Sequence, residues 1–204
     1  MAYSDFSFAD LKKFHLRIVS NNTMFEQVQP LSAEDWLVRM LERSVTRAQA
    51  IGTEKARSEF IIAPILLETQ VIVGAERLAL FSGTEFTVDE TQGLKGRCDY
   101  MFCSSTNSFQ IEAPILAVVE AKTDNINAAL PQCIAELLAS QIFNEREGVS
   151  IPELYGVVTT GSLWRFLRLK ALTVEVEERD RSVSDLEELL GILVSITRVG
   201  SASA

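Results

Sequence analysis

The segment Ile115–Ala121 reads Ile-Leu-Ala-Val-Val-Glu-Ala, and it constrains the fold more than any other part of the chain. Its apolar residues run almost continuously instead of alternating with polar ones, so a strand formed here must be covered on both faces. Strands of this kind lie inside a sheet that has helices on both sides. The sequence therefore predicts an α/β fold, with a central mixed β-sheet flanked by helices.

The residues before this strand predict two helices and two further strands. Ser32 and Asp35 have the spacing of a capping box, and the apolar residues that follow them repeat at helical intervals. Pro64 should kink or break the second helix, because proline cannot donate the backbone hydrogen bond of a helix interior. The predicted segments are a helix over residues 36–52, a helix starting near Thr53, and strands at residues 84–88 and 94–103.

The residues after the central strand predict a helix, three strands and a closing helix. Gly161-Ser162 separates two β-rich runs by only two residues, which is typical of a tight hairpin. Residues 172–176 alternate between apolar and polar side chains, as in a half-exposed edge strand. The predicted segments are a helix over residues 128–144, strands at residues 155–160, 163–169 and 172–176, and an amphipathic helix starting near Ser184.

The domain organisation follows from length and composition. A chain of 204 residues suits one well-packed domain. Residues 1–30 mix phenylalanines with polar residues and are expected to form an N-terminal arm. Residues 31–204 are expected to form a single α/β domain, with its core over residues 53–170. Trp36 and the phenylalanines are expected to be buried in the hydrophobic interior.

Charge and residue counts exclude several classes of function. Lys and Arg total 19 while Asp and Glu total 28, so the net charge of −9 repels nucleic acid except at a locally basic site. The single histidine, His15, excludes most zinc centres. The three cysteines lack a Cys-x-x-Cys spacing and are expected to be reduced and buried. A signal peptide and a membrane-spanning run are not recognisable, so we expect a cytoplasmic protein without a membrane partner.

Glu120-Ala121-Lys122, at the end of the central strand, is the main candidate for chemistry. Residues two apart on a strand point to the same face, so a carboxylate and an ammonium end this apolar strand together. The triplet is weak evidence alone, because average composition gives about one such pair in a chain of this length. Asp10-Leu11-Lys12 is another example in this sequence. A solvated pair at a strand end is the simpler interpretation.

Neighbouring residues favour a metal site. Asp99 lies on the preceding strand, where its carboxylate could approach Glu120. Two carboxylates and a strand carbonyl form an oxygen-rich site that suits a divalent ion such as Mg²⁺. Lys122 beside such an ion could orient a water molecule or stabilise charge on a phosphate. Gln132 lies in the first turn of the next helix, within reach of the same site.

This ordered set of elements resembles the PD-(D/E)XK nuclease superfamily, whose fold is restriction-endonuclease-like. The hairpin at residues 157–166 is also similar to the strand pair in nuclease domains of type I restriction subunits. The resemblance implies a metal-dependent nuclease that hydrolyses DNA phosphodiester bonds, with a Mg²⁺-bound water attacking the phosphate. It implies a set of site residues: Asp99, Glu120 and the Ala121 carbonyl would bind Mg²⁺ or Mn²⁺, Lys122 would be catalytic, and Gln132 would be an auxiliary catalytic residue.

The resemblance also implies a carboxylate on the second helix. Glu59 fits because the family residue tends to lie near the start of that helix, and Glu68 is the alternative if the helix breaks at Pro64. The two are nine residues apart, about 2.5 turns, so a straight helix would direct them to opposite sides. The sequence departs from the family at Cys98, which replaces the proline before the aspartate.

Lys95 and Arg97 are the candidate substrate-binding residues. They share strand parity with Asp99 if Gly96 forms no bulge, which would place two cations beside the metal. Three further cations could add a basic rim for DNA: Arg165, Arg168 and Lys170. Ordinary strand-edge charges explain all five equally well.

An alternative function keeps the same fold without catalysis. The domain could be a catalytically silent or regulatory version of the restriction-endonuclease-like fold that binds a protein partner. Intact Asp99, Glu120 and Lys122 favour the nuclease, whereas the net acidity and the lack of a recognition domain favour the alternative. A homo-oligomer is compatible with either function.

Overall fold

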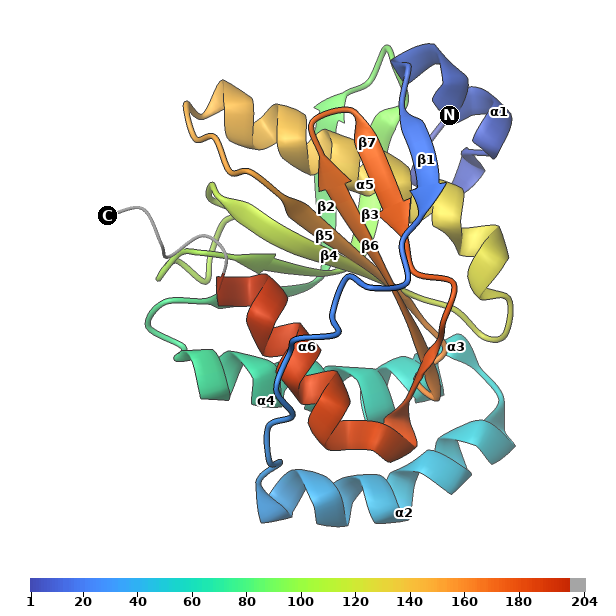
Figure 1. Ribbon diagram of the computed structural model, residues 1–204, viewed down its shortest axis with the longest axis vertical. Helices are drawn as coiled ribbons and strands as arrows, with labels where there is room; N and C mark the ends of the chain where they lie inside the picture. The colour runs from blue at the N-terminus through green and yellow to red at the C-terminus, as the bar shows by residue number, and fades with distance from the viewer. Residues whose placement is uncertain (199–204) are drawn as a thin grey trace.

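The computed structural model describes residues 1–198, and its centre is a mixed sheet of eight strands (Figure 1). The strand order is β1-β7-β6-β5-β4-β3-β2, and β8 pairs with β6 beside this series. The strands are β1 (Arg17–Ser20), β2 (Ala79–Asp89), β3 (Leu94–Cys103), β4 (Ile115–Ala121), β5 (Leu154–Thr159), β6 (Leu163–Lys170), β7 (Thr173–Val176) and β8 (Arg181–Ser182). The predicted α/β fold with a central mixed sheet is confirmed.

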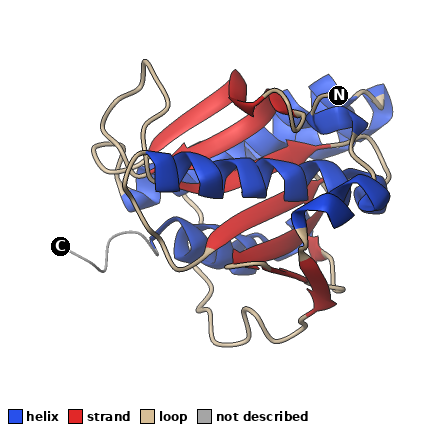
Figure 2. Cartoon of the chain, turned by 90° about the horizontal axis from the view of Figure 1, so that it is seen from above, coloured by secondary structure: helices blue, strands red, loops and turns tan. Residues whose placement is uncertain are grey.

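Helices cover both faces of the sheet. They are α1 (Phe8–Leu11), α2 (Asp35–Ile51), α3 (Glu54–Arg57), α4 (Ala63–Val73), α5 (Ile126–Arg146) and α6 (Leu186–Arg198). In Figure 2, α5 lies across the strands, and Figure 1 shows α2, α4 and α6 on the opposite side. The helices α5 and α6 confirm the two helices predicted from the apolar residues of these segments.

The predicted central strand is buried along its whole length as β4. Ile115 and Val118 belong to the apolar cluster under α5, whereas Leu116 and Val119 belong to the cluster under α4 and α6. Gly156 on the neighbouring β5 lets α5 lie close, because a Cβ at this position would come within 2.7 Å of the Cys133 sulfur. The strand pair β4 and β5 is parallel, with α5 as the connection between them.

Residues 1–30, expected to be an appended arm, contribute one strand to the sheet and a few buried side chains to the core. Tyr3, Phe6 and Leu11 are buried in the cluster beneath α5. The strand β1 pairs in parallel with β7, so β1 rather than β7 is the outer strand at this side of the sheet. Phe25 then packs on the other face, with its ring 5.3 Å from that of Phe166. These residues therefore join both apolar layers of one domain.

The helix start at α2 also differs from the prediction. Glu34, not Ser32, is the N-cap residue, and the Glu68 carboxylate accepts a hydrogen bond from the Glu34 N–H at 2.9 Å. Leu37 and Leu41 form the buried stripe of α2, whereas Trp36 is 41% exposed and does not belong to the core. Tertiary packing thus selects a narrower face of this helix than the sequence pattern suggested.

Three local predictions are corrected, extended or confirmed. The second helix is distorted rather than broken before Pro64: it runs continuously from Glu54 to Val73, and a π-helical turn over Ser58–Ile62 joins α3 to α4. The predicted strand at residues 84–88 starts earlier, at Ala79. Cys98, Cys103 and Cys133 are buried and free, as expected. Among the helices of residues 1–198, none is long and apolar enough to cross a membrane.

Candidate functional site

Asp99 and Glu120 meet where β3 lies beside the end of β4. Tyr100 pairs with Val119, so Asp99 lies next to Glu120 across the antiparallel ladder. The Ala121 N–H donates a hydrogen bond to Asp99 Oδ2 at 2.8 Å, and the Asp99 and Glu120 carboxyl groups lie close enough for their charges to interact. The structure therefore brings together the two carboxyl groups that the sequence analysis paired.

Lys122 joins these carboxyl groups directly after β4. Its ammonium donates a hydrogen bond to Glu120 Oε1, and its backbone N–H donates to the Thr159 carbonyl of β5 at 2.8 Å. The Lys122 side chain is 28% exposed, whereas that of Glu120 is 2% exposed. The Lys122 side chain is therefore in contact with solvent, and its charge acts on the Glu120 carboxyl group, which is shielded from solvent.

Burial sets the protonation of this pair of carboxyl groups. Desolvation raises the pKa of Asp99, although the Ala121 N–H and the Lys122 charge oppose the rise. Desolvation and the nearby Asp99 charge raise the pKa of Glu120 to about 7, against the opposing effect of Lys122. The pKa of Lys122 is raised because the attraction of Glu120 outweighs the effect of its burial. One ammonium thus does not compensate the neighbouring acids fully.

A further carboxyl group, Glu136, faces the same region from α5. Glu136 is fully buried, and the Gln132 amide Nε2 donates to its Oε1 at 3.1 Å. Desolvation raises the pKa of Glu136 well above its usual value, and the Glu120 and Asp99 charges add to the rise. We call Asp99, Glu120 and Glu136 the carboxyl cluster. The Gln132 amide is therefore held by Glu136, and among the described residues no hydrogen bond joins it to Asp99 or Glu120.

Glu136 is not among the residues predicted from the sequence, although the sequence carries one signal for it. It lies four residues after Gln132, between the buried residues Ala135 and Leu137 of a helix. Carboxylates are rarely placed in an apolar helix interior without a partner or a function. A charged residue in the middle of this apolar run could have marked the cluster.

Neither predicted helix carboxylate belongs to this group of contacts. The Glu59 side chain is 53% exposed and forms an ion pair with Lys55 at 3.1 Å. Glu68 is a fully buried residue of α4, and its carboxylate accepts a hydrogen bond from the Glu34 N–H at the start of α2. Glu54, the first residue of α3, is instead the helix acid whose charge raises the pKa values of Glu120 and Lys122.

The cluster contains buried carboxylate oxygens, the type of donor that hard divalent cations prefer. The atoms Glu120 Oε2 and Glu136 Oε2 are buried, and within residues 1–198 neither has a hydrogen-bond partner. Burying an unpartnered carboxylate oxygen is costly, and a cation would relieve that cost. In the described part of the chain, no three His, Cys, Asp or Glu side chains converge as a metal-ligand set. The predicted site needs only two, Asp99 and Glu120, together with the Ala121 carbonyl.

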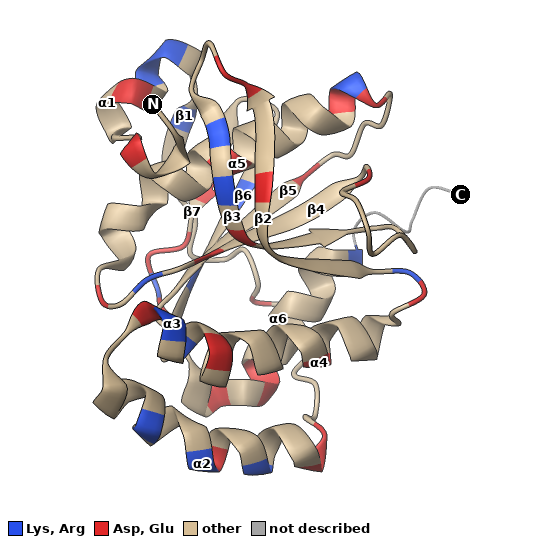
Figure 3. Cartoon of the chain, turned by 180° about the vertical axis from the view of Figure 1, so that it is seen from behind, with Lys and Arg blue, Asp and Glu red and all other residues tan. Residues whose placement is uncertain are grey.

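The cations predicted to bind substrate are engaged with acids. Lys95 pairs with Glu90 and Arg97 pairs with Glu85, both at 3.2 Å. Figure 3 shows these blue segments of β3 beside red segments of β2 and its turn. Because these side chains are substantially exposed, the pairs are weak and could exchange partners.

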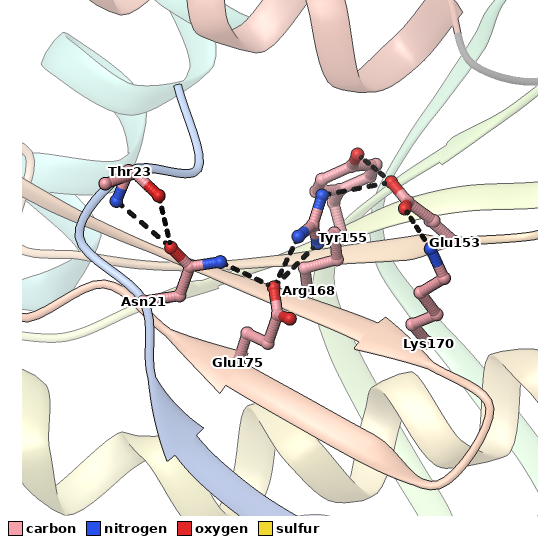
Figure 4. A network of polar contacts seen from close by, with 7 residues as sticks. All are labelled: Asn21, Thr23, Glu153, Tyr155, Arg168, Lys170 and Glu175. Carbon is pink, nitrogen blue, oxygen red and sulfur yellow. Dashed lines mark hydrogen bonds and ion pairs between the residues drawn. The ribbon is translucent and has the colours of Figure 1, made fainter. Parts of the chain in front are cut away.

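The predicted basic rim is also paired. Arg165 contacts Asp180 at 2.8 Å, and Arg168 contacts Glu175 at 2.5 Å. Lys170 and Arg168 share Glu153, each at 3.4 Å. Figure 4 shows the wider Arg168 network, which contains Asn21, Thr23, Glu153, Tyr155, Arg168, Lys170 and Glu175. These charges connect β5, β6, β7 and the segment after β1.

The protein-family models, the curated proteins and the solved structures contain no match for this chain. The resemblance to PD-(D/E)XK nucleases therefore remains a prediction from the motifs and their order. The arrangement of Asp99, Glu120 and Lys122 within this sheet is the structural basis for a functional proposal.

Proposed function

We propose that this protein is a metal-dependent nuclease that hydrolyses DNA phosphodiester bonds, as its resemblance to the PD-(D/E)XK superfamily implies. The observation that carries the proposal is the meeting of Asp99, Glu120 and Lys122 at the end of a buried central strand. An excess of carboxyl groups beside one partly exposed ammonium lowers the stability of the fold, so stability does not explain why these groups are placed there. Such arrangements are concentrated at functional sites.

Each residue has a role in this proposal. Asp99, Glu120 and the Ala121 carbonyl would hold Mg²⁺ or Mn²⁺. When bound, such an ion supplies Lewis-acid polarisation of a phosphate and a more acidic water molecule. Lys122, which reaches solvent, would stabilise negative charge developing on the phosphate. Gln132 would orient the site through its hydrogen bond to Glu136.

A cleavage assay tests the proposal directly. Linear duplex, supercoiled and single-stranded DNA are incubated with the protein and either Mg²⁺ or Mn²⁺. Lys122→Ala should lower the cleavage rate by about 10²–10³-fold, the usual effect of removing a charge-stabilising group. Lys55→Ala is a matched control, because Lys55 is exposed and its ion-pair partner is the exposed Glu59. Absence of cleavage of every DNA form, or equal rates for Lys122→Ala and the wild type, would contradict the proposal.

The ion pairs of the predicted DNA-binding cations favour a second candidate function. Lys95, Arg97 and Arg168 all lie within ion-pair distance of carboxylates, and the chain carries a net charge of −9. A catalytically silent or regulatory domain that binds a protein partner would need no positive surface for DNA. Stabilisation by Mn²⁺ together with metal-dependent cleavage would exclude this candidate.

A further inference from the structure

A groove with a volume of about 650 Å³ follows α2, and its lining contains no residue of the carboxyl cluster. Its lining combines apolar side chains with arginines and includes Trp36, Arg39, Met40, Arg43, Arg47 and Phe60. The cluster and the nuclease proposal do not use any of these residues. The groove therefore needs its own explanation.

Its charge is opposite to that of the whole chain. Arg39, Arg43 and Arg47 are exposed and spaced four residues apart, so they form a row that rises about 6 Å per step. Arg39 contacts Asp35 at 3.6 Å, but within residues 1–198 Arg43 and Arg47 have no ion-pair partner. Figure 3 shows blue segments recurring along α2. The whole chain carries a net charge of −9, but this row makes the face of α2 locally positive. A locally positive face attracts an acidic partner.

Its floor is apolar and continues onto α4. Trp36 is 41% exposed, and Trp36 and Met40 also line a second hollow of about 390 Å³. This hollow extends to Pro64 and to Leu67, which is 47% exposed. Exposed tryptophan, methionine and arginine are enriched where proteins bind proteins, and the strongest contacts often involve tryptophan and arginine.

We propose that this groove docks an amphipathic α-helix of a partner protein, with acidic residues spaced four apart beside its apolar face. Such a helix repeats its carboxylates about every 6 Å, which matches the arginine row of α2. Its leucine-like residues would cover Trp36 and Met40. A DNA duplex fits less well, because protein–DNA interfaces are more polar and more positive than this apolar floor.

Fluorescence anisotropy with a designed probe tests this proposal. The probe is a labelled 18-residue helical peptide with leucines on one face and glutamates four residues apart along its edge. The double variant Arg43→Glu/Arg47→Glu should weaken binding at least tenfold, and so should Trp36→Ala. The matched control is Arg17→Glu, an exposed arginine on β1, far from α2 in the fold. All substituted residues are exposed, so melting curves should confirm unchanged folding.

A charge-swapped probe, with lysine replacing each glutamate, completes the experiment. It should bind the wild type at least tenfold more weakly than the acidic probe and should prefer the Arg43→Glu/Arg47→Glu variant. Equal binding of the two probes to the wild type would overturn the proposal. It would also be overturned if the acidic probe failed to bind, or if an 18-base-pair DNA duplex bound the wild type more tightly and lost that binding in the double variant.

Discussion

The carboxyl cluster around Glu120 and the Arg168 network both lie at strands of the same sheet, the cluster with Glu136 of α5 added, but their charges are balanced differently. In the network, Arg168 and Lys170 face Glu153 and Glu175. The pKa values of both acids are lowered, because hydrogen bonds and Arg168 outweigh the effect of their partial burial. In the cluster, burial dominates and the pKa of Glu120 rises to about 7.

The difference separates a structural group from a candidate functional one. The network satisfies its acids with cations of the same domain and connects neighbouring strands (Figure 4). The cluster leaves buried carboxylate oxygens without partners in the described residues and includes only one ammonium, Lys122. An excess of buried acid is explained if a cation from solution completes the site. Removing an acid from the cluster should therefore stabilise the metal-free protein, whereas breaking the network should destabilise it.

The largest effect is expected from Glu120→Gln in metal-free protein. The native pKa of about 7 lies above the ordinary value of 4.5, so folded Glu120 holds its proton to higher pH than unfolded Glu120. The free energy of unfolding should then fall as pH rises from about 5 to 8. The full shift corresponds to roughly 3 kcal/mol, shared with the coupled acids Asp99 and Glu136. Glu120→Gln should flatten this fall and be more stable than the wild type at pH 8.

Urea unfolding of both proteins between pH 5 and 8, in EDTA, measures this effect. Glu175→Gln is the comparison variant, because the pKa of Glu175 is lowered and its loss should not stabilise the protein at pH 8. A wild type equally stable at pH 5 and pH 8, with the same profile in Glu120→Gln, would remove the contrast between the two regions.

Arg168→Ala tests the network and should have the next largest effect. The Arg168 side chain is only 21% exposed, and its removal would leave Glu153 and Glu175 without their shared cation. We expect a loss of about 1–3 kcal/mol, below the cost of breaking a fully buried pair. Arg97→Ala is the control, because its pair with Glu85 is largely exposed and should contribute under about 1 kcal/mol. Equal losses in the two variants, measured by urea unfolding, would show that the network is not structurally special.

The sequence predicted the elements that local patterns determine. The apolar run of β4 and the apolar face of α5 specify a buried strand and its covering helix, and strand order then brings Asp99 to Glu120. The four residues of β1 carry no strong strand pattern, and only pairing with the distant β7 makes them a strand. Trp36 was misassigned because the packing of α2, not its composition, decides which face is buried.

In the candidate site too, the residues placed by local pattern could be predicted, and those placed by helix packing could not. Glu120 and Lys122 could be paired because their spacing along one strand fixes their direction. Glu54 and Glu136 come from separate helices, so their approach to Glu120 depends on how those helices pack. Glu59 and Glu68 were favoured by position along the chain, but the π-helical turn and the cap of α2 place them elsewhere.

Melting curves with and without Mn²⁺ test most directly whether the carboxyl cluster is a divalent-cation site. At a free concentration ten times Kd, an ion that binds only the native state adds about 1.4 kcal/mol. For a chain of this length that is a rise of roughly 3–6 °C in Tm. Asp99→Asn should lose most of this rise and melt higher than the wild type in EDTA, whereas Glu59→Gln should keep the rise. A wild type whose Tm does not respond to millimolar Mn²⁺, and which is destabilised by Asp99→Asn, would contradict the account.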